Sequence, residues 1–474
     1  MKINSSASMK DGNDMRKRIL AMRWNERVGK GILAAFCALA VLMPPAWLMA
    51  WSEHPLVTYP VLAAMPGVAD ARNVRVESIN SFLGAEGQKI EKLLAEEEAW
   101  AKKNLIWYPS LPESLFFKAS GSPGDLRERF CRAIRINPRV KFPLYLQLLP
   151  GNPPAERPAL RPADISFLGD ISDWEKTRFV SLKEGESIRP LDVAVSASDE
   201  PDLLGLDIGL FEDNATDFGK RYGLGLQPFG NPNLEYGSQA PFHMGFYHES
   251  DIMYFFAGFL KKCLPEARIH LYKGLARLAF ESGHPYWGWR FTGLGLHYLA
   301  DLAQPYHATV LPGVSTAYAL WINTIDMAGI HGPKADAIQL VSNRHTALEK
   351  FAQIYLQRAY QKGESANPLL AALGSAADGT PYDDGVPRNV VSRMAHDKAE
   401  QTDKILEEAM PKKFVSDPGF ELGTSAERRQ IVERAAAEKG PAAIDRLTLL
   451  LRELLTPFAT QGRGYVRAVL KADR

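Results

Sequence analysis

The sequence has little cysteine and few stretches in which apolar and polar residues alternate. Only 3 of its 474 residues are cysteines, too few for a fold held together by disulfides. Cys37 lies in an apolar N-terminal segment, so Cys131 and Cys263 form either one disulfide pair or two buried thiols. Because apolar residues mostly recur at helical spacing, the chain is predicted to be all-α.

Excess charge and two common hydrolase motifs are also absent. The net charge is +1, and the first 50 residues hold 8 of the 56 Lys+Arg but only 3 of the 55 Asp+Glu. The rest of the chain is therefore slightly acidic, with no basic excess for binding a long polyanion. Neither Gly-x-Ser-x-Gly nor His-Glu-x-x-His occurs, so these serine-hydrolase and zinc-protease signatures are missing.

The N-terminus has the layout of an export signal. Basic residues between positions 16 and 30 precede an apolar run at 32–43, and Ala50 follows two prolines. A basic region, an apolar region and a small residue at a cleavage point make up a signal peptide. We therefore predict that residues 1–50 are a signal peptide and that the protein is periplasmic or secreted. The alternative is a retained membrane anchor, because residues 31–51 carry no charge and could span a bilayer.

Irregular and helical stretches divide the rest of the chain. Proline-rich residues 138–192 and glycine-rich residues 205–240 are predicted to be loop-rich insertions in a helical domain that covers residues 51–365. Residues 366–474 are expected to form a loop and a C-terminal helical extension. Its last helix is predicted over residues 442–455, where leucines form one stripe.

The strongest chemical signal is the segment His-Tyr-Leu-Ala-Asp-Leu-Ala-Gln-Pro-Tyr-His at residues 297–307. Residues four apart lie one above the other on a helix, so His297 and Asp301 present an imidazole and a carboxylate to one point. Both are ligand types that suit zinc. Pro305 should end the helix, which turns His307 toward a neighbouring ion.

A second histidine and acid, His345 and Glu349, are also four residues apart. Alone, such a pair is more often an ion pair on a solvated helix face than a metal site. Leucines surround the first motif, which predicts a helix that is apolar nearly all round and therefore buried. Because buried ionisable groups need partners, the two motifs together favour a metal site.

The two motifs, in this order, resemble those of the bacterial zinc-dependent phospholipases C. They are similar, less closely, to those of the single-strand-specific fungal nucleases that share that fold. The resemblance implies a helical fold with three zinc ions, one of them bound by an N-terminal tryptophan. Cleavage after Ala50 would make Trp51 that residue, with His54 close behind it. The resemblance covers Trp51–His54 and residues 243–349.

The resemblance also implies which residues bind each ion. The three sets are Trp51, His54 and Asp301; His297, Asp301, His243 and Asp199; and His307, His345 and Glu349. Asp301 would thereby bridge two ions. His248 is an alternative to His243, and Asp202 or Asp207 is an alternative to Asp199. Asp199 would also orient a water molecule or act as general base.

The implied activity is phosphodiester hydrolysis by a phospholipase C that acts on glycerophospholipids at a membrane surface. Aromatic residues near the motifs suit acyl chains or a choline head group. A nuclease is the second expectation, because aromatic rings also stack on the bases of single strands. A non-catalytic, zinc-stabilised envelope protein is the third, but nine candidate ligands exceed the four of a closed structural site. No protein partner is predicted.

Overall fold

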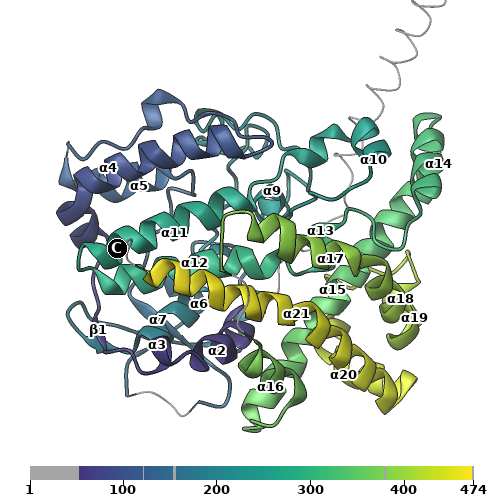
Figure 1. Ribbon diagram of the computed structural model, residues 1–474. Coiled ribbons are helices and arrows are strands. Elements are labelled where there is room, and N and C mark those ends of the chain that lie inside the picture. The colour runs from purple at the N-terminus through teal and green to yellow at the C-terminus, as the bar shows by residue number, and fades with distance from the viewer. Residues whose placement is uncertain (1–52, 121, 153–155, 378–380, 472–474) are drawn as a thin grey trace, which may run out of the picture.

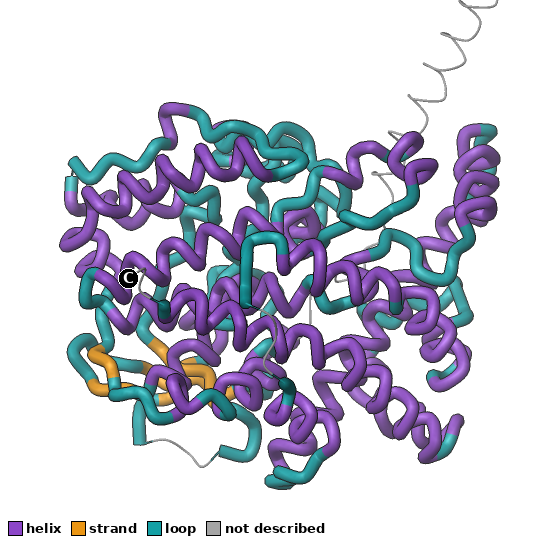
Figure 2. Tube along the Cα trace, viewed as in Figure 1, coloured by secondary structure: helices purple, strands orange, loops and turns teal. Residues whose placement is uncertain are grey.

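The computed structural model describes residues 53–120, 122–152, 156–377 and 381–471. The predicted signal peptide or anchor at residues 1–50 and the predicted ligand Trp51 lie outside the described residues. None of the helices in the described ranges is long and apolar enough to cross a membrane. Helix accounts for 61% of the structure and strand for 3%, which confirms a mainly helical fold (Figure 2).

A buried helix, α12 (Pro285–Asp301), lies at the centre of the molecule. It packs against α11 (Pro265–Glu281), α7 (Pro190–Ala197) and α21 (Pro441–Leu470) (Figure 1). Glycines allow this close packing, because a Cβ on Gly293 would overlap the carbonyl of Ala194 in α7, and one on Gly295 would overlap the Tyr465 hydroxyl in α21. All residues of α12 after Pro285 are buried, as the leucine pattern predicted.

The other helices of the described residues pack around α12 and its neighbours. Besides the helices already named, the α-helices before α12 are α2 (Pro55–Ala63), α3 (Pro66–Ala69), α4 (Ile79–Asn104), α5 (Leu126–Ala133), α6 (Pro162–Ile165), α8 (Glu200–Leu203), α9 (Ala240–His243) and α10 (Asp251–Phe256). Those after it are α13 (Pro305–Ala308), α14 (Thr316–Met327), α15 (Gly332–Gln361), α16 (Pro368–Ser375), α17 (Arg393–Asp397), α18 (Ala399–Ala409), α19 (Lys412–Val415) and α20 (Ile431–Lys439).

Short 3-10 helices connect several of these elements, and one π-helix does the same. The 3-10 helices are η2 (Glu113–Leu115), η3 (Pro123–Asp125), η4 (Ser172–Trp174), η5 (Gly219–Arg221), η6 (Tyr236–Gln239), η7 (Gly258–Lys261) and η9 (Ala426–Gln430). The π-helix is η8 (Pro387–Ser392).

Residues 138–192, which the sequence predicted to be loop-rich, contribute strands to two small antiparallel sheets. Strands β2 (Tyr145–Leu148), β4 (Arg178–Ser181) and β3 (Ala159–Leu160) form one sheet, in which Tyr145 pairs with Ser181 and Ala159 with Val180. Strands β1 (Val74–Arg75) and β5 (Ser187–Ile188) form the other. Strands this short give little periodicity to read. The insertion at 205–240 is irregular apart from η5 and η6, as expected.

The C-terminal region packs into the body of the protein instead of standing apart from it. Its last helix is longer than predicted, since α21 covers Pro441–Leu470 and buries residues along its whole length against α12 and α16. Asp384 lies 3.4 Å from Nε2 of His270 in α11, and Glu97 of α4 lies 2.6 Å from Nδ1 of the same ring. Cys131 and Cys263 are both free and buried, which settles them as thiols.

Candidate metal centre

Three groups of buried side chains could hold metal ions. They are His54, His297 and Asp301; Asp202, His243 and His297; and His307, His345 and Glu349. In each group, one potential ligand atom from every residue lies within 4.8 Å of the others. The first two groups share His297, and the third begins six residues after Asp301. The structure therefore brings both histidine–carboxylate motifs into one buried region.

The end of α12 explains how one short segment serves all of these groups. His297 and Asp301 lie on the last turn of the helix, which ends at Asp301. Gln304 is extended, at φ −88° and ψ 120°, and Pro305 begins α13 as its first residue, a position that tolerates a missing N–H. The predicted break before Pro305 is confirmed, and it places His307 in the third group.

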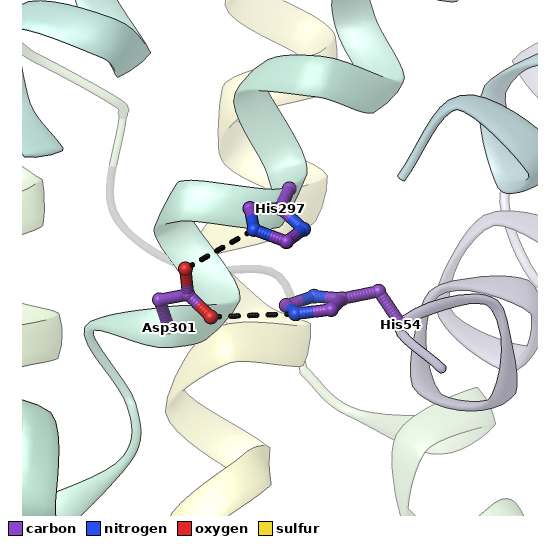
Figure 3. A group of neighbouring side chains, drawn as sticks. All are labelled: His54, His297 and Asp301. Carbon is purple, nitrogen blue, oxygen red and sulfur yellow. Dashed lines mark ion pairs between the residues drawn. The ribbon is translucent and has the colours of Figure 1, made fainter. Parts of the chain in front are cut away.

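The first group has the spacing of metal ligands (Figure 3). Asp301 Oδ1 lies 3.3 Å from His54 Nε2, and Asp301 Oδ2 lies 3.3 Å from His297 Nε2. Two ligand atoms about 2.0–2.1 Å from zinc at the tetrahedral angle are about 3.3 Å apart. Among the described residues, neither nitrogen of His54 nor Oδ1 of Asp301 makes a hydrogen bond. Buried polar atoms without partners are rare, so these atoms fit a bound cation.

The second group lies on the other oxygen of Asp301. Asp301 Oδ2 is 2.9 Å from His243 Nδ1, and His243 Nδ1 is 3.2 Å from His297 Nε2. Asp202 completes the group, with one oxygen 3.9 Å from His243 Nδ1 and the other 3.9 Å from His297 Nε2. Because the two oxygens of Asp301 face different histidines, this carboxylate has the geometry of a bridge between two ions.

The structure places Asp202, and not Asp199, in this second group. The carboxylate of Asp199 instead accepts hydrogen bonds from the His54 amide at 3.1 Å, Gln147 Nε2 at 2.9 Å and Trp174 Nε1 at 2.7 Å. Asp199 is the residue before α8, and Asp202 lies within it. Asp199 therefore holds the segment that carries His54, and Asp202 is the carboxylate that joins the second group.

The alternatives Asp207 and His248 have other contacts. Asp207 lies behind His243, with Oδ2 3.4 Å from His243 Nε2, and also accepts from Arg268 Nε at 2.9 Å and Tyr298 Oη at 2.5 Å. It is thus a carboxylate that orients a ligand histidine. His248 Nε2 donates to the carbonyl of Arg388 at 2.9 Å, and His248 belongs to none of the three groups.

The third group combines α13 with α15. His345 Nε2 is 2.6 Å from Glu349 Oε1, and His307 Nε2 is 3.8 Å from the same oxygen. Gln304 Nε2 donates to Glu349 Oε1 at 3.2 Å, a support that the sequence reasoning missed although Gln304 stands in the motif. Within the described residues, His307 Nε2 makes no hydrogen bond, so it is available to an ion.

Backbone carbonyls fix the tautomers of two ligand histidines. His297 Nδ1 donates to the Ser198 carbonyl at 2.9 Å, and His307 Nδ1 donates to the His243 carbonyl at 3.2 Å. A carbonyl only accepts, so the proton of each neutral ring sits on Nδ1. The lone pair of Nε2 then faces the metal group, as in histidine–metal sites with an ordered outer shell.

Burial and neighbouring charges give several ligands the protonation state that metal binding needs. Burial lowers the pKa of His307 to about 3 and holds the pKa of His297 well below its usual value, so both rings are neutral. Burial opposes the charge of Asp301, but the surrounding histidines hold its pKa well below its usual value. Burial, with the negative charges of Asp301 and Asp199, raises the pKa of Asp202 to about 7, and a cation beside it would favour the carboxylate.

The segment before α2 directs His54 into the centre. Glu53 has φ +60°, a left-handed conformation that is uncommon for residues other than glycine. Its buried carboxylate accepts hydrogen bonds from Thr177 Oγ1 and from Gln357 Nε2, the second at 2.6 Å. Burial raises the pKa of Glu53 to about 7. These contacts and the Asp199 bond hold the backbone turn that aims His54 at Asp301.

Comparison with protein-family models, with curated proteins and with solved structures finds no match for this chain. The chemistry must therefore be inferred from the centre itself. Clusters of buried histidine, aspartate and glutamate that could bind metal ions are what the structure establishes.

Proposed function

We propose that this protein is a zinc-dependent phosphodiester hydrolase of the phospholipase C type. The proposal rests on the position of Asp301. Its Oδ1 lies 3.3 Å from His54 Nε2, and its Oδ2 lies 2.9 Å from His243 Nδ1. One carboxylate between two histidine groups, with a third group beside it, supports a multinuclear centre. A structural zinc site is normally closed by four ligands around one ion. It does not need a carboxylate that lies between two groups of histidines.

Each group of residues has a definite part in the proposed centre. His54 and Asp301 would hold one zinc, together with the terminal amine of Trp51 if export removes residues 1–50. Asp202, His243, His297 and Asp301 would hold a second, and His307, His345 and Glu349 a third. Bound zinc would supply a Lewis acid for the phosphate and lower the pKa of a water molecule.

The chain's own residues position these ligands. Asp207 holds His243 from behind, Ser198 and His243 fix the two imidazoles by their carbonyls, and Gln304 steadies Glu349. Asp202 is our candidate to orient the attacking water, in place of Asp199, whose carboxylate already accepts three hydrogen bonds. The proposed substrate is a glycerophospholipid, and the proposed location is the periplasm or the exterior.

The direct test is metal analysis of the exported protein, followed by assays on phosphatidylcholine and single-stranded DNA at low and moderate salt. We expect roughly three zinc ions per chain and release of phosphocholine that depends little on salt. Binding a strand through several phosphates weakens steeply with ionic strength. A single bound zinc would refute the multinuclear centre. Cleavage of DNA with no lipid hydrolysis would make the protein a nuclease.

A further inference from the structure

Helices α10 and α14 lie toward the same side of the molecule (Figure 1), and each exposes large hydrophobic side chains. Six of the twelve exposed large hydrophobic side chains of the described chain lie on α10, on α14 or just after it: Ile252, Phe255, Tyr318, Trp321, Met327 and Ile330. Phe255 is 71% exposed and Trp321 is 51% exposed. Large exposed apolar patches mark interaction sites.

Helix α14 lacks the charged outer face of an ordinary surface helix. The only charged side chain within it is Asp326, which accepts from Lys334 Nζ at 2.9 Å and from His331 Nδ1 at 2.6 Å. Ala319 and Ile322 are buried, whereas Tyr318 and Trp321 are exposed with their rings 5.5 Å apart. This helix is therefore apolar on its outer side as well as its inner side.

Helix α10 also exposes apolar side chains, and two lysines lie at the end of η7 and directly after it. An uncharged, apolar run from Ile252 to Leu260 ends in Lys261 and Lys262, and Lys261 Nζ lies 4.5 Å from the ring of Tyr254. Aromatic side chains beside lysines are typical of segments that lie in the interface of a bilayer. Such a segment binds both the apolar boundary and anionic head groups.

The surface is joined to the metal centre through one hydrophobic cluster. Met244, which follows the ligand His243, packs there with Val310, and Met253, Tyr254 and Leu311 pack against the same cluster. Helix α14 itself lies in the chain between two residues of the third group, His307 and His345. Anything that binds α10 therefore lies against the cluster that includes Met244, and α14 is linked along the chain to His307 and His345.

We infer that α10 and α14 form a docking surface for a phospholipid bilayer, an inference that rests on the proposed function because the bilayer supplies the substrate. The side chains named above would enter the head-group region, with Lys261 and Lys262 at its polar edge. A second copy of the chain is a poorer occupant. Six side chains at about half exposure leave on the order of 500 Å², less than the about 800 Å² per partner of a stable interface.

The test measures vesicle binding and hydrolysis separately. The exported, zinc-loaded protein is sedimented with vesicles of phosphatidylcholine and phosphatidylglycerol, and its activity is measured on short-chain phosphatidylcholine below the micelle concentration. In the double variant Phe255→Ser/Trp321→Ser we expect vesicle binding to fall about tenfold or more, with unchanged hydrolysis of the monomeric lipid. The control Leu449→Ser/Leu470→Ser removes two exposed side chains on α21 and should bind as wild type.

The two proposals fail in different ways. Wild-type protein that hydrolyses monomeric lipid but stays in the supernatant, or a double variant that binds vesicles as wild type does, overturns the docking surface alone. Vesicle binding that the double variant loses, without hydrolysis of any lipid, overturns the proposed function and leaves the docking surface standing. A dimeric wild type that becomes monomeric in the double variant would assign α10 and α14 to self-association and overturn the docking proposal.

Discussion

Replacing Asp202 and Asp199 separately by asparagine tests how the centre is assigned. The two residues are three positions apart and both fully buried, at 1% and 0% exposure, so the pair is closely matched. Asp202 lies 3.9 Å from two ligand histidines, whereas Asp199 contacts the backbone of His54 and two side-chain donors. We expect Asp202→Asn to lose metal and Asp199→Asn to lose stability.

The expected magnitudes follow from these contacts. Substituting an outer-shell partner of a metal site typically lowers affinity 10–100-fold, and a ligand should matter more, so Asp202→Asn should weaken one zinc by more than about 100-fold. An asparagine at 199 offers one acceptor oxygen and an NH₂ group to three donors. At least one buried donor then loses its acceptor, which lowers the free energy of unfolding by about 1–3 kcal/mol.

Zinc is counted by elemental analysis after dialysis against a metal buffer, and unfolding is followed in urea. Asp202→Asn should retain roughly two zinc ions and Asp199→Asn roughly three. Loss of an ion from Asp199→Asn together with full occupancy in Asp202→Asn would refute the assignment and restore Asp199 as the ligand.

Three further predictions concern other parts of the protein. His297→Ala and Asp301→Asn should each abolish hydrolysis, and Asp301→Asn should lose more zinc because both oxygens face ligands. His284→Ala serves as control, and equal damage there would show the centre to be misassigned. N-terminal sequencing of the exported protein should begin at Trp51, and any residue retained before it would remove the proposed amine ligand. Burial lowers the pKa of His270, but the hydrogen bonds that its ring donates to Asp384 and Glu97 raise the pKa overall. Its stabilising effect is therefore complete below the unfolded-state value near 6.5 and is lost as pH rises through the higher folded-state pKa. In thermal unfolding, His270→Gln should destabilise the protein more at pH 6 than at pH 9, and equal effects at both would contradict this reading.

The sequence predicted the features that depend on local spacing. His297 and Asp301 share one helical turn, and Pro305 breaks the helix because its ring excludes a regular turn. These follow from residues within a few positions of each other. The burial of α12 was also predictable, since its leucines leave no polar face.

Features that depend on tertiary packing could not be predicted from the sequence. Asp199 and Asp202 are three positions apart in one short segment. No pattern of residue types shows which of the two lies beside the histidines. The support of His243 by Asp207 joins segments that pack together only in the folded chain. The strands of residues 138–192 are only two to four residues long, too short to give a periodic signal.

The candidate metal ligands come from segments far apart in the sequence, and this has a consequence for folding. His54 and Glu349 belong to one centre, and the Glu53–Gln357 hydrogen bond next to it joins residues 304 positions apart. Contacts so distant in sequence form late and slow folding, because a long loop must close before they stabilise anything. A nascent chain that ends before α15 lacks His345 and Glu349 and cannot complete the centre. The proposed metal ions could therefore stabilise only a chain that has been synthesised and folded at least through α15.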